Sequence, residues 1–329
     1  MLRPPRIKLS VVLICASVLC ASCRKSYHSK SERYVFISAN TSLPYWQEAK
    51  AGFVAAGQEM RVKVDFTGPS TYSPQDELKA FQDAVNSHPS GILVSPAQAD
   101  LFQDAINSAV QNGIPVVCVD SDSPRSRRIL FVGTDNYRVG LTIGRLMATL
   151  MRQHGRLAVI TIPGQFNQEE RLRGVEDALK PYPYMSFYEA ANDRGSSKVA
   201  EQEVASLLQQ NADVAGIVCL EASGGPGAAQ AVDQYGAGGK LAIVAMDANP
   251  ETLDWISKGM INATVTQKPY TMGFYGLRFL DDLHHNSVHE FKNWQDAPAS
   301  PLPAFVDTGT EVVDRRNVDD YRNALASVQ

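Results

Sequence analysis

Short apolar runs recur along the chain from position 34, and stretches with apolar residues at helical spacing lie between them. Each run is apolar throughout rather than alternating, which is typical of parallel strands that are covered on both faces of a sheet. The pattern predicts ten strands, at positions 34–39, 62–67, 91–95, 115–120, 129–133, 157–162, 185–189, 216–220, 241–247 and 263–266.

The predicted helices occupy the stretches between these strands. One of them follows Ser73 and Pro74, which supply a cap and a first-turn proline. Helices are expected at 46–60, 76–86, 101–111, 139–151, 199–210, 227–235 and 272–284. Strands that alternate with helices through right-handed crossovers predict an α/β fold with doubly wound parallel sheets.

The length of the chain indicates two lobes. A chain of 329 residues is long for one domain, because single cores stop growing at roughly 250–300 residues. The strand pattern stops near 133–136 and a new helix begins at 139, so we place a lobe boundary there. Two sheets also account for the number of predicted strands.

The first 23 residues have the order of a secretory signal. Three basic residues precede an apolar run at 9–19, and small residues precede Cys23. The run is shorter than the about 20 residues that a membrane span needs. Small residues followed by cysteine resemble a bacterial lipobox, although Cys20 stands where that pattern prefers leucine. We predict a signal at 1–22, a lipid on Cys23 and a tether at 23–33; plain signal cleavage and a retained anchor are the alternatives.

Composition and charge narrow the function classes. Hydrophobic residues make up 44% and charged residues 20%, which excludes disordered, collagen-like and polytopic membrane chains. Removal of positions 1–22 lowers the net charge from −4 to −7, so no global electrostatic attraction to nucleic acid is expected. Of five cysteines, only Cys118 and Cys219 lie in the globular part, and we expect two buried free thiols.

Polar and aromatic side chains follow several predicted strands. In open α/β sheets, ligands bind outside the carboxyl ends of the strands. The residues at these positions include Asn40, Tyr45, Trp46, Asp120, Asp122, Gln165, Gln168, Arg171, Arg173, Glu221, Asp247, Asn249 and Gln267. Carboxylate, amide and guanidinium groups can each bond the hydroxyls of a sugar, which both donate and accept, and an aromatic ring can cover its C–H face.

Six segments, in this order and spacing, resemble the ribose/galactose group of periplasmic sugar-binding proteins. They are LPYWQEAKAGF at 43–53, PVVCVDSD at 115–122, VGTDNYRVG at 132–140, ERLRGVEDAL at 170–179, AMDANPE at 245–251 and ATVTQKPYTMG at 263–273. The resemblance covers about 34–315 and implies the type I binding-protein fold, in which a three-strand hinge joins two doubly wound parallel-sheet lobes. It implies an N-terminal lobe of 34–134 plus 268–308 and a C-terminal lobe of 135–267 plus 309–329.

The resemblance also implies seven ligand-binding residues. They comprise two stacking aromatics, three carboxylates at strand ends, an arginine of the second lobe and a hinge-side amide: Tyr45, Trp46, Asp120, Glu221, Asp247, Arg173 and Gln267. Three positions depart from ribose binders. Leu43 stands in place of an Asn, Ser121 in place of an Arg and Glu221 in place of an Asn. Another pentose, a hexose or a polyol is therefore as compatible with the sequence as ribose.

Structural roles compete with some of these ligand roles. Asp120 and Asp247 could cap the loops that follow their strands, and Tyr45 or Trp46 could be a core aromatic of the first helix. We expect both aspartates to be ionised acceptors that approach the ligand from different lobes.

The arginine and the glutamate have structural alternatives as well. Arg173 could pair with Glu169 or Glu170 one turn back on its helix, and Glu221 could cap the turn at 224–226.

Other features do not indicate further chemistry. His284, His285 and His289 cluster without a cysteine or carboxylate to complete a metal site, so we expect a solvated helix end and no metal. The segment GGPG at 224–227 lacks the Lys and Ser or Thr of a phosphate-binding loop. No G-x-S-x-G, H-E-x-x-H or C-x-x-C motif occurs, so we predict neither a cofactor nor enzymatic activity.

We therefore predict a lipid-anchored extracytoplasmic protein. Cytosolic ATP and NAD do not reach that location, which disfavours a kinase or a dehydrogenase. The protein would capture a monosaccharide or related polyol as a monomer and deliver it to an ABC-type membrane permease. Two alternatives remain at this stage. One is a ligand-sensing partner of a membrane receptor, and the other is a sugar-processing enzyme.

Overall fold

The computed structural model describes residues 27–29, 31–210, 213–286 and 302–328. The predicted signal at 1–22, the lipidation site Cys23 and His289 lie outside the described residues. Within the described part of the chain, no helix is both long and apolar enough to cross a membrane.

The first sheet is entirely parallel and has the strand order β12-β5-β4-β3-β1-β2. Its strands are β1 (Arg33–Ile37), β2 (Lys63–Thr67), β3 (Gly91–Val94), β4 (Val116–Val119), β5 (Leu130–Gly133) and β12 (Phe305–Asp307). Every residue of β3, β4 and β5 is buried, as expected for strands that are covered on both faces.

Four helices cover this sheet: α2 (Pro44–Met60), α3 (Pro74–Asn86), α4 (Ala99–Gln111) and α10 (Pro269–His285). Residues of α2 and α10 share one apolar cluster with β1, and residues of α3 and α4 contribute to a second. The predicted start of α3 is confirmed, because the Ser73 hydroxyl accepts a hydrogen bond from the Asp76 N–H and Pro74 lies in the first turn.

The second sheet has the order β13-β11-β10-β9-β6-β7, and a short strand, β8, also pairs with β6. Its strands are β6 (Gly155–Thr161), β7 (Met185–Phe187), β8 (Ala191–Asn192), β9 (Val214–Cys219), β10 (Ala242–Met246), β11 (Ala263–Thr266) and β13 (Glu311–Asp314). The edge strand β13 is antiparallel to β11, so this sheet departs from the all-parallel expectation at one edge.

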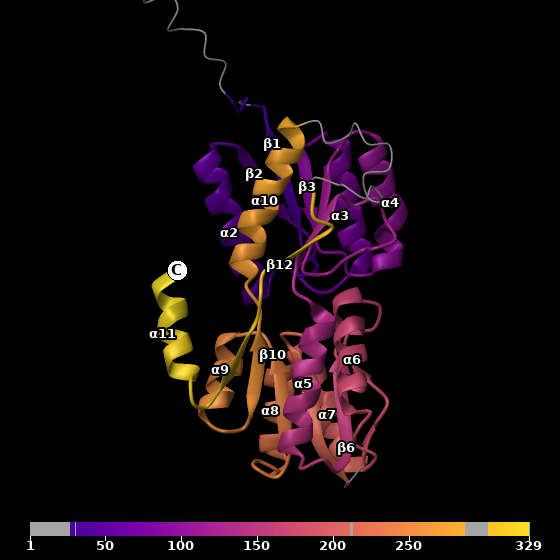
Figure 1. Ribbon diagram of the computed structural model, residues 1–329, viewed down its shortest axis with the longest axis vertical. Helices are drawn as coiled ribbons and strands as arrows, with labels where there is room; N and C mark the ends of the chain where they lie inside the picture. Colours follow the sequence, from indigo (N-terminus) through magenta and orange to yellow (C-terminus); the bar gives the residue numbers. More distant parts are fainter. Residues whose placement is uncertain (1–26, 30, 211–212, 287–301, 329) are drawn as a thin grey trace, which may run out of the picture.

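The helices around the second sheet are α5 (Asn136–Leu150), α6 (Phe166–Leu179), α7 (Ser197–Gln210), α8 (Gly224–Gln234), α9 (Pro250–Ser257) and α11 (Val318–Val328). Figure 1 shows the two sheets with their helices as two bodies, one above the other, and α11 beside α9 at the flank. The predicted α/β fold with two doubly wound lobes is confirmed.

The chain passes between the two sheets three times: from β5 to α5, from β11 to α10 and from β12 to β13. Side chains and backbone connect these passages. Thr134 donates to the Gln267 side-chain oxygen at 2.9 Å, and the Thr308 N–H donates to the Gly133 carbonyl at 2.7 Å. Gly309, at φ +80°, provides the left-handed turn of the third passage.

The sequence pattern missed β8, β12, β13, α9 and α11, and it indicated the helix that carries Arg173, α6, without giving its bounds. The strands among these have two to four residues and are mostly half-buried or exposed, so they lack the apolar runs that identify the central strands. The two buried free thiols are confirmed, since Cys118 and Cys219 are buried and unbridged.

Candidate ligand-binding site

A cavity of about 50 Å³ lies between the two sheets, at the carboxyl ends of their strands. It is lined by Ala39, Asn40, Leu43, Tyr45, Trp46, Tyr72, Asp120, Ile162, Gln165, Asn167, Gln168, Arg171, Gly195, Glu221, Ala222, Asp247 and Gln267. Six of the seven residues that the sequence singled out are among them. Only Arg173 is not.

Asp120 and Asp247 leave their strands in the same way, one in each sheet. Their φ angles are +62° and +66°, a left-handed conformation that aspartate tolerates better than most residues. The N–H groups donate to the neighbouring strands, Asp120 to Val132 at 3.0 Å and Asp247 to Val265 at 2.9 Å. Each lobe thus presents a strand-end carboxylate to the cavity.

The Asp120 carboxylate is held mainly by side chains. Tyr45 donates to its Oδ1 at 2.7 Å, Ser95 to its Oδ2 at 3.4 Å and the Asn167 amide to its Oδ2 at 3.1 Å. Burial and the nearby Asp120 charge raise the pKa of Tyr45 well above its usual value, so the phenol keeps its proton and can donate. Because Asn167 belongs to α6, its bond to Asp120 joins the two lobes across the cavity.

Both aspartates are buried, and this modifies the expectation that they are ionised. Burial raises the pKa of Asp120, although Arg171 and the hydrogen bonds from Tyr45 and Ser95 act in the opposite direction. Burial also raises the pKa of Asp247, to about 7, against the opposing effects of Arg171 and Gln267. At neutral pH, Asp247 is therefore a mixture of the ionised and protonated forms in this closed pocket.

Arg171 is the cation of the pocket and is 1% exposed. Its Nε donates to the Asn136 side chain at 2.8 Å, Nη1 to the Leu220 carbonyl at 2.7 Å and Nη2 to the Gln267 side-chain oxygen at 3.0 Å. A guanidinium has five N–H donors. These partners use three of them within the described residues, which leaves donors for a ligand.

The expectation that Arg173 faces the cleft is wrong. Arg173 is exposed on α6, where its Nε donates to Glu170 at 3.1 Å and its guanidinium lies over the Tyr137 ring, 4.1 Å from the centroid. The alternative pairing with Glu170 is the one observed. Residues two apart on a helix are separated by about 200°, so a helix that directs Arg171 inward directs Arg173 to solvent.

The sequence also missed the role of Asn167 and did not rank Gln168 among the site residues. Both are buried and, with Arg171, form the inward face of α6 at helical spacing. The Gln168 side-chain oxygen accepts from Thr161 and from the Ile162 N–H, both at 2.7 Å. The sequence held a signal for this face: polar residues three and four positions before Arg171, soon after a strand end, lie on the same side of a helix.

Close packing of α5 and α6 sets the position of Arg171. A Cβ at Gly140 would lie 2.0 Å from the Arg171 carbonyl oxygen, and one at Gly174 would lie 2.8 Å from the Gly140 Cα. Only glycine allows this approach, which brings Asn136 on α5 within bonding distance of the Arg171 guanidinium.

Gln267 links the hinge to the pocket through both ends of its amide. The side-chain oxygen accepts from Thr134 and Arg171, and Nε2 donates to Asp247 Oδ1 at 2.9 Å. Asp247, the arginine and one hinge passage are therefore coupled through a single side chain.

The aromatic residues belong to both the core and the pocket. Trp46 is 6% exposed and packs in the apolar cluster of the first lobe, yet it also lines the cavity. Its ring meets Tyr45 edge to face, with centroids 5.1 Å apart. Tyr72, which the sequence did not single out, lines the same cavity and donates to the Ala97 carbonyl at 3.1 Å. Trp46 can therefore be a core residue of the first lobe and still offer a surface to a ligand.

Glu221 likewise combines its two expected roles. Its carboxylate lines the cavity and accepts a hydrogen bond from the Gly224 N–H at the start of α8. Asp193 lies beside it, and burial together with the Glu221 charge raises the pKa of Asp193 well above its usual range.

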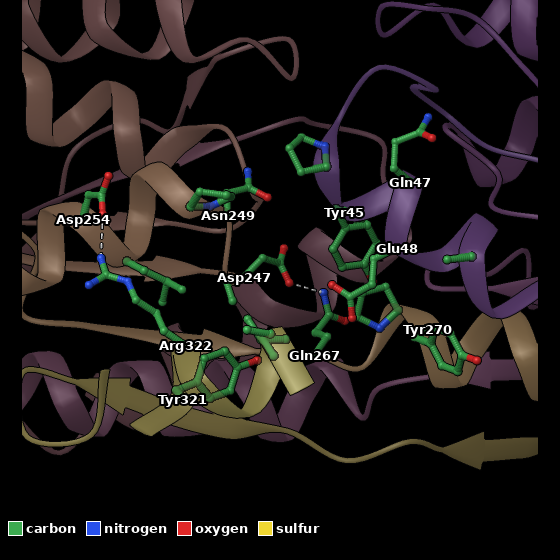
Figure 2. Close-up of a pocket in the computed structure, with 18 residues that line it drawn as sticks. Tyr45, Gln47, Glu48, Asp247, Asn249, Asp254, Gln267, Tyr270, Tyr321 and Arg322 are labelled. Carbon is green, nitrogen blue, oxygen red and sulfur yellow. Dashed lines mark hydrogen bonds and ion pairs between the residues drawn. The ribbon is translucent and has the colours of Figure 1, made fainter. Parts of the chain in front are cut away.

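A second cavity, of about 740 Å³, adjoins the pocket on the flank that α11 borders. Its walls include Glu48 of α2, Tyr270 of α10 and Tyr321 of α11, and it shares Tyr45, Asp247 and Gln267 with the central pocket. Figure 2 shows the hydrogen bond between Gln267 and Asp247 with the Tyr45 ring near it, and the ion pair between Arg322 and Asp254 at the edge of the cavity.

The chain was compared with known proteins. A family model described as a periplasmic binding protein domain matches residues 34–285. The D-allose-binding periplasmic protein of Escherichia coli (strain K12) is 28% identical over 260 residues, which cover 76% of this chain and 83% of the relative.

Solved structures agree with the family match. A sugar-binding protein of a sugar ABC transporter from Bacillus halodurans is 34% identical, with a TM-score of 0.75 and coverage of 88% of this chain and 100% of that chain. GanP, a glucose-galactose binding protein from Geobacillus stearothermophilus, is 26% identical, with a TM-score of 0.80 and coverage of 88% and 99%. The chain belongs to the periplasmic binding protein domain family.

Proposed function

We propose that this protein captures a monosaccharide or related polyol between its two lobes and delivers it to an ABC-type permease. The observation that carries the proposal is the convergence of Asp120, Asp247, Arg171 and Trp46 on one cavity at the strand ends of both sheets. The named relatives, which bind D-allose or glucose and galactose, support a sugar as the ligand class.

The pocket offers a sugar both kinds of hydrogen-bonding partner. Asp120 and Asp247 accept bonds from hydroxyl groups, and the remaining N–H groups of Arg171 donate to hydroxyl or ring oxygens. Each hydrogen bond to a charged group contributes about 1.5–3 kcal/mol. Trp46 adds an apolar surface for the C–H face of the ring.

Ligand entry requires the lobes to separate. A cavity of about 50 Å³ has room for roughly three to five waters, which is less than a monosaccharide needs. The bond between Asn167 and Asp120 also closes the cavity. We propose that the lobes, 34–134 plus 268–308 and 135–267 plus 309–329, rotate about the three passages and close again on the ligand.

The lining residues favour no single sugar. Leu43 and Glu221, two of the positions that depart from ribose binders, line the pocket, whereas Ser121 is buried outside it. We therefore propose a pentose, hexose or polyol that places a hydroxyl toward Glu221.

The remaining elements of the proposal concern location and assembly. We propose that a signal at 1–22 is removed and that lipid on Cys23 anchors an extracytoplasmic monomer through the tether. The chain would bind its ligand without a cofactor and without chemical change, since the pocket presents groups suited to holding a sugar.

A thermal-shift screen against pentoses, hexoses and polyols tests the ligand class, followed by calorimetry on each sugar that shifts the transition. A ligand at 100 times its dissociation constant stabilises the folded state by about 2.7 kcal/mol. The recovered sugar should be unchanged, and deletion of the protein should abolish uptake of that sugar. A complete screen without a stabilising sugar or polyol would contradict the proposal.

A further inference from the structure

Two imidazoles and two carboxylates converge at the far end of the first lobe. His28 and Glu32 precede β1, and Asp281 and His285 lie in the last two turns of α10. The ligand pocket lies beyond the carboxyl end of β1, so this group is at the opposite edge of the sheet. We call these four residues the His28 cluster.

The ligand atoms of the His28 cluster lie within a few ångströms of one another. His28 Nε2 lies 3.1 Å from both oxygens of Asp281, and His285 Nε2 lies 3.2 Å from Glu32 Oε2 and 3.6 Å from Asp281 Oδ1. One ligand atom from each residue can be chosen so that all four lie within 4.8 Å of one another. Neighbouring ligands of a tetrahedral zinc are about 3.3–3.6 Å apart, given bonds of about 2.0–2.2 Å.

The cluster is enclosed. The exposed fractions of the side chains are 19% for His28, 16% for His285 and 6% for each carboxylate. The Tyr27 ring stacks on His285, with centroids 4.3 Å apart. Two carboxylates in such an enclosed place offset the charge of a divalent cation.

Residues outside the His28 cluster also hold its two carboxylates in place by hydrogen bonds. Tyr34, buried on β1, donates its hydroxyl to Asp281 Oδ1 at 3.0 Å, and the Ser29 N–H donates to Glu32 Oε1 at 2.5 Å. Groups of this kind orient metal ligands and contribute to affinity. A cleft lined by Tyr27, His28 and Ser29 gives solvent access to the His28 cluster. Two arginines also line this cleft: Arg61, and Arg278, which pairs with Glu59.

The sequence contains this arrangement as two pairs at the same spacing. Asp281 and His285 are four residues apart and so share one face of α10, and His28 and Glu32 are also four residues apart. The neighbouring His284 is exposed and meets the Tyr34 ring edge instead. The carboxylate that the histidines lacked in the sequence analysis is therefore Asp281, one helical turn back.

We propose that His28, Glu32, Asp281 and His285 bind one zinc ion as a closed, tetrahedral structural site. Imidazole and carboxylate ligands suit zinc, and four protein ligands leave no position for a substrate. The ion fastens the segment before β1 to the end of α10. It thereby holds residues 28 and 32 of the predicted tether, 23–33, against the first lobe.

Zinc titration of the full-length, chelator-treated protein tests the site, with stoichiometry from calorimetry and affinity from competition with a chromophoric chelator. One equivalent should bind. Because loss of an orienting partner alone costs 10- to 100-fold, His28→Ala and His285→Ala should each weaken zinc binding by about 100-fold or more. His284→Ala, on the same helix end, is the matched control and should bind as the wild type does.

Two further measurements keep the test independent of folding. Tyr34→Phe should retain the four ligands and weaken zinc binding by about 10-fold. Zinc at 100 times its dissociation constant should raise the unfolding temperature of wild type and His284→Ala by about 5 °C, and that of His28→Ala by much less. Far-UV circular dichroism confirms that each variant is folded.

The cluster has a simpler alternative, in which protonated histidines form ion pairs with the carboxylates and no metal binds. Absence of zinc binding to the wild type would establish that alternative and overturn the proposal. Equal zinc affinity of the wild type and the His28→Ala, His285→Ala double variant would overturn it as well, because the ion would then bind elsewhere.

Discussion

The two walls of the ligand pocket use the same backbone device and different side chains. Each wall has an aspartate at a strand end with φ above +60°. On the first lobe, the aromatic side chains of Tyr45, Trp46 and Tyr72 line the pocket together with Asp120. The second lobe contributes mainly amides and charged groups: Gln165, Asn167, Gln168, Arg171, Glu221, Asp247 and Gln267.

The two aspartates differ accordingly. Three side-chain donors bind Asp120, whereas the Gln267 amide is the one hydrogen-bond donor recorded for the Asp247 carboxylate within the described residues. Burial raises the pKa of Asp247 to about 7. We therefore expect the first wall to shape and cover the ligand, whereas the second wall carries the polar network around Arg171.

The largest effect should come from breaking the polar wall at its centre. Arg171→Met removes a buried cation and leaves the Leu220 carbonyl and the Gln267 side-chain oxygen without this donor. Loss of a buried charged partner costs about 3–5 kcal/mol, so sugar affinity should fall by more than about 100-fold. Arg173→Met on the same helix is the matched control and should bind within about twofold of wild type, because Arg173 is exposed.

Calorimetry on both variants, with folding checked by circular dichroism, measures this difference. If Arg171→Met does not fold, Arg171→Lys retains the charge without the planar donors and should still lose affinity. Equal losses at the two arginines would show that the structure assigns the wrong one to the pocket.

A smaller loss should follow from breaking the aromatic wall. Trp46→Ala removes the apolar surface of the pocket, and we expect affinity to fall by about 10-fold, since an aromatic contact adds about 0.5–1.5 kcal/mol beyond area burial. Trp46→Phe keeps an aromatic ring and should lose much less. Because Trp46 also packs in the core, affinity is measured only below the unfolding transition of each variant. Unchanged affinity in Trp46→Ala would assign this residue to the core alone.

Tyr45→Phe tests the polar contribution of the first wall without changing the shape of that wall. It removes the donor that lies 2.7 Å from Asp120 Oδ1 and leaves the ring in place. A hydrogen bond to a charged group contributes about 1.5–3 kcal/mol, but this bond is made to Asp120 and not to the ligand. Because only part of that contribution should appear in ligand binding, we expect a change in affinity of roughly fivefold. Titration calorimetry would resolve this change. An effect as large as that of Arg171→Met would place the main polar contacts on the first wall instead.

The smallest effect concerns the pH dependence that Asp247 gives to the ligand-free protein. Its pKa is about 7 in the folded chain, against about 3.9 for an unfolded aspartate. When the pH lies between these two pKa values, Asp247 is protonated in the folded chain and ionised in the unfolded chain. The free energy of unfolding therefore decreases as pH rises through this window.

Asp247→Asn removes this proton uptake. Between about pH 6 and pH 8, the unfolding temperature of the wild type should fall by about 2–4 °C more than that of the variant. Other buried acids with raised pKa values, such as Asp193 and Glu77, act equally in both proteins. Scanning calorimetry gives the two curves, and parallel curves would mean that Asp247 does not titrate in this range.

The sequence predicted the features that follow from local pattern. The central strands are continuous apolar runs, and the strand-end positions of Asp120 and Asp247 follow from where those runs stop. The short strand β13 has only one buried residue, so its pairing with β11 depends on tertiary contacts that no local pattern reveals.

Facing directions on helices were harder to predict. Arg171 and Arg173 have the same chemistry two positions apart, and only the packing of Gly140 against Gly174 decides which one faces the pocket. The His28 cluster depended on tertiary structure in the same way, because His28 and Asp281 are brought together over 253 positions of sequence.

The central claim is that one carboxylate from each lobe holds the sugar. The most direct measurement is calorimetry of Asp120→Ala and Asp247→Ala with the best ligand from the screen. Each variant should bind roughly 10- to 200-fold more weakly than wild type. His285→Ala and Cys118→Ser, which lie outside the pocket, should bind nearly unchanged. If both aspartate variants bind the sugar within about twofold of wild type, the assigned site is wrong.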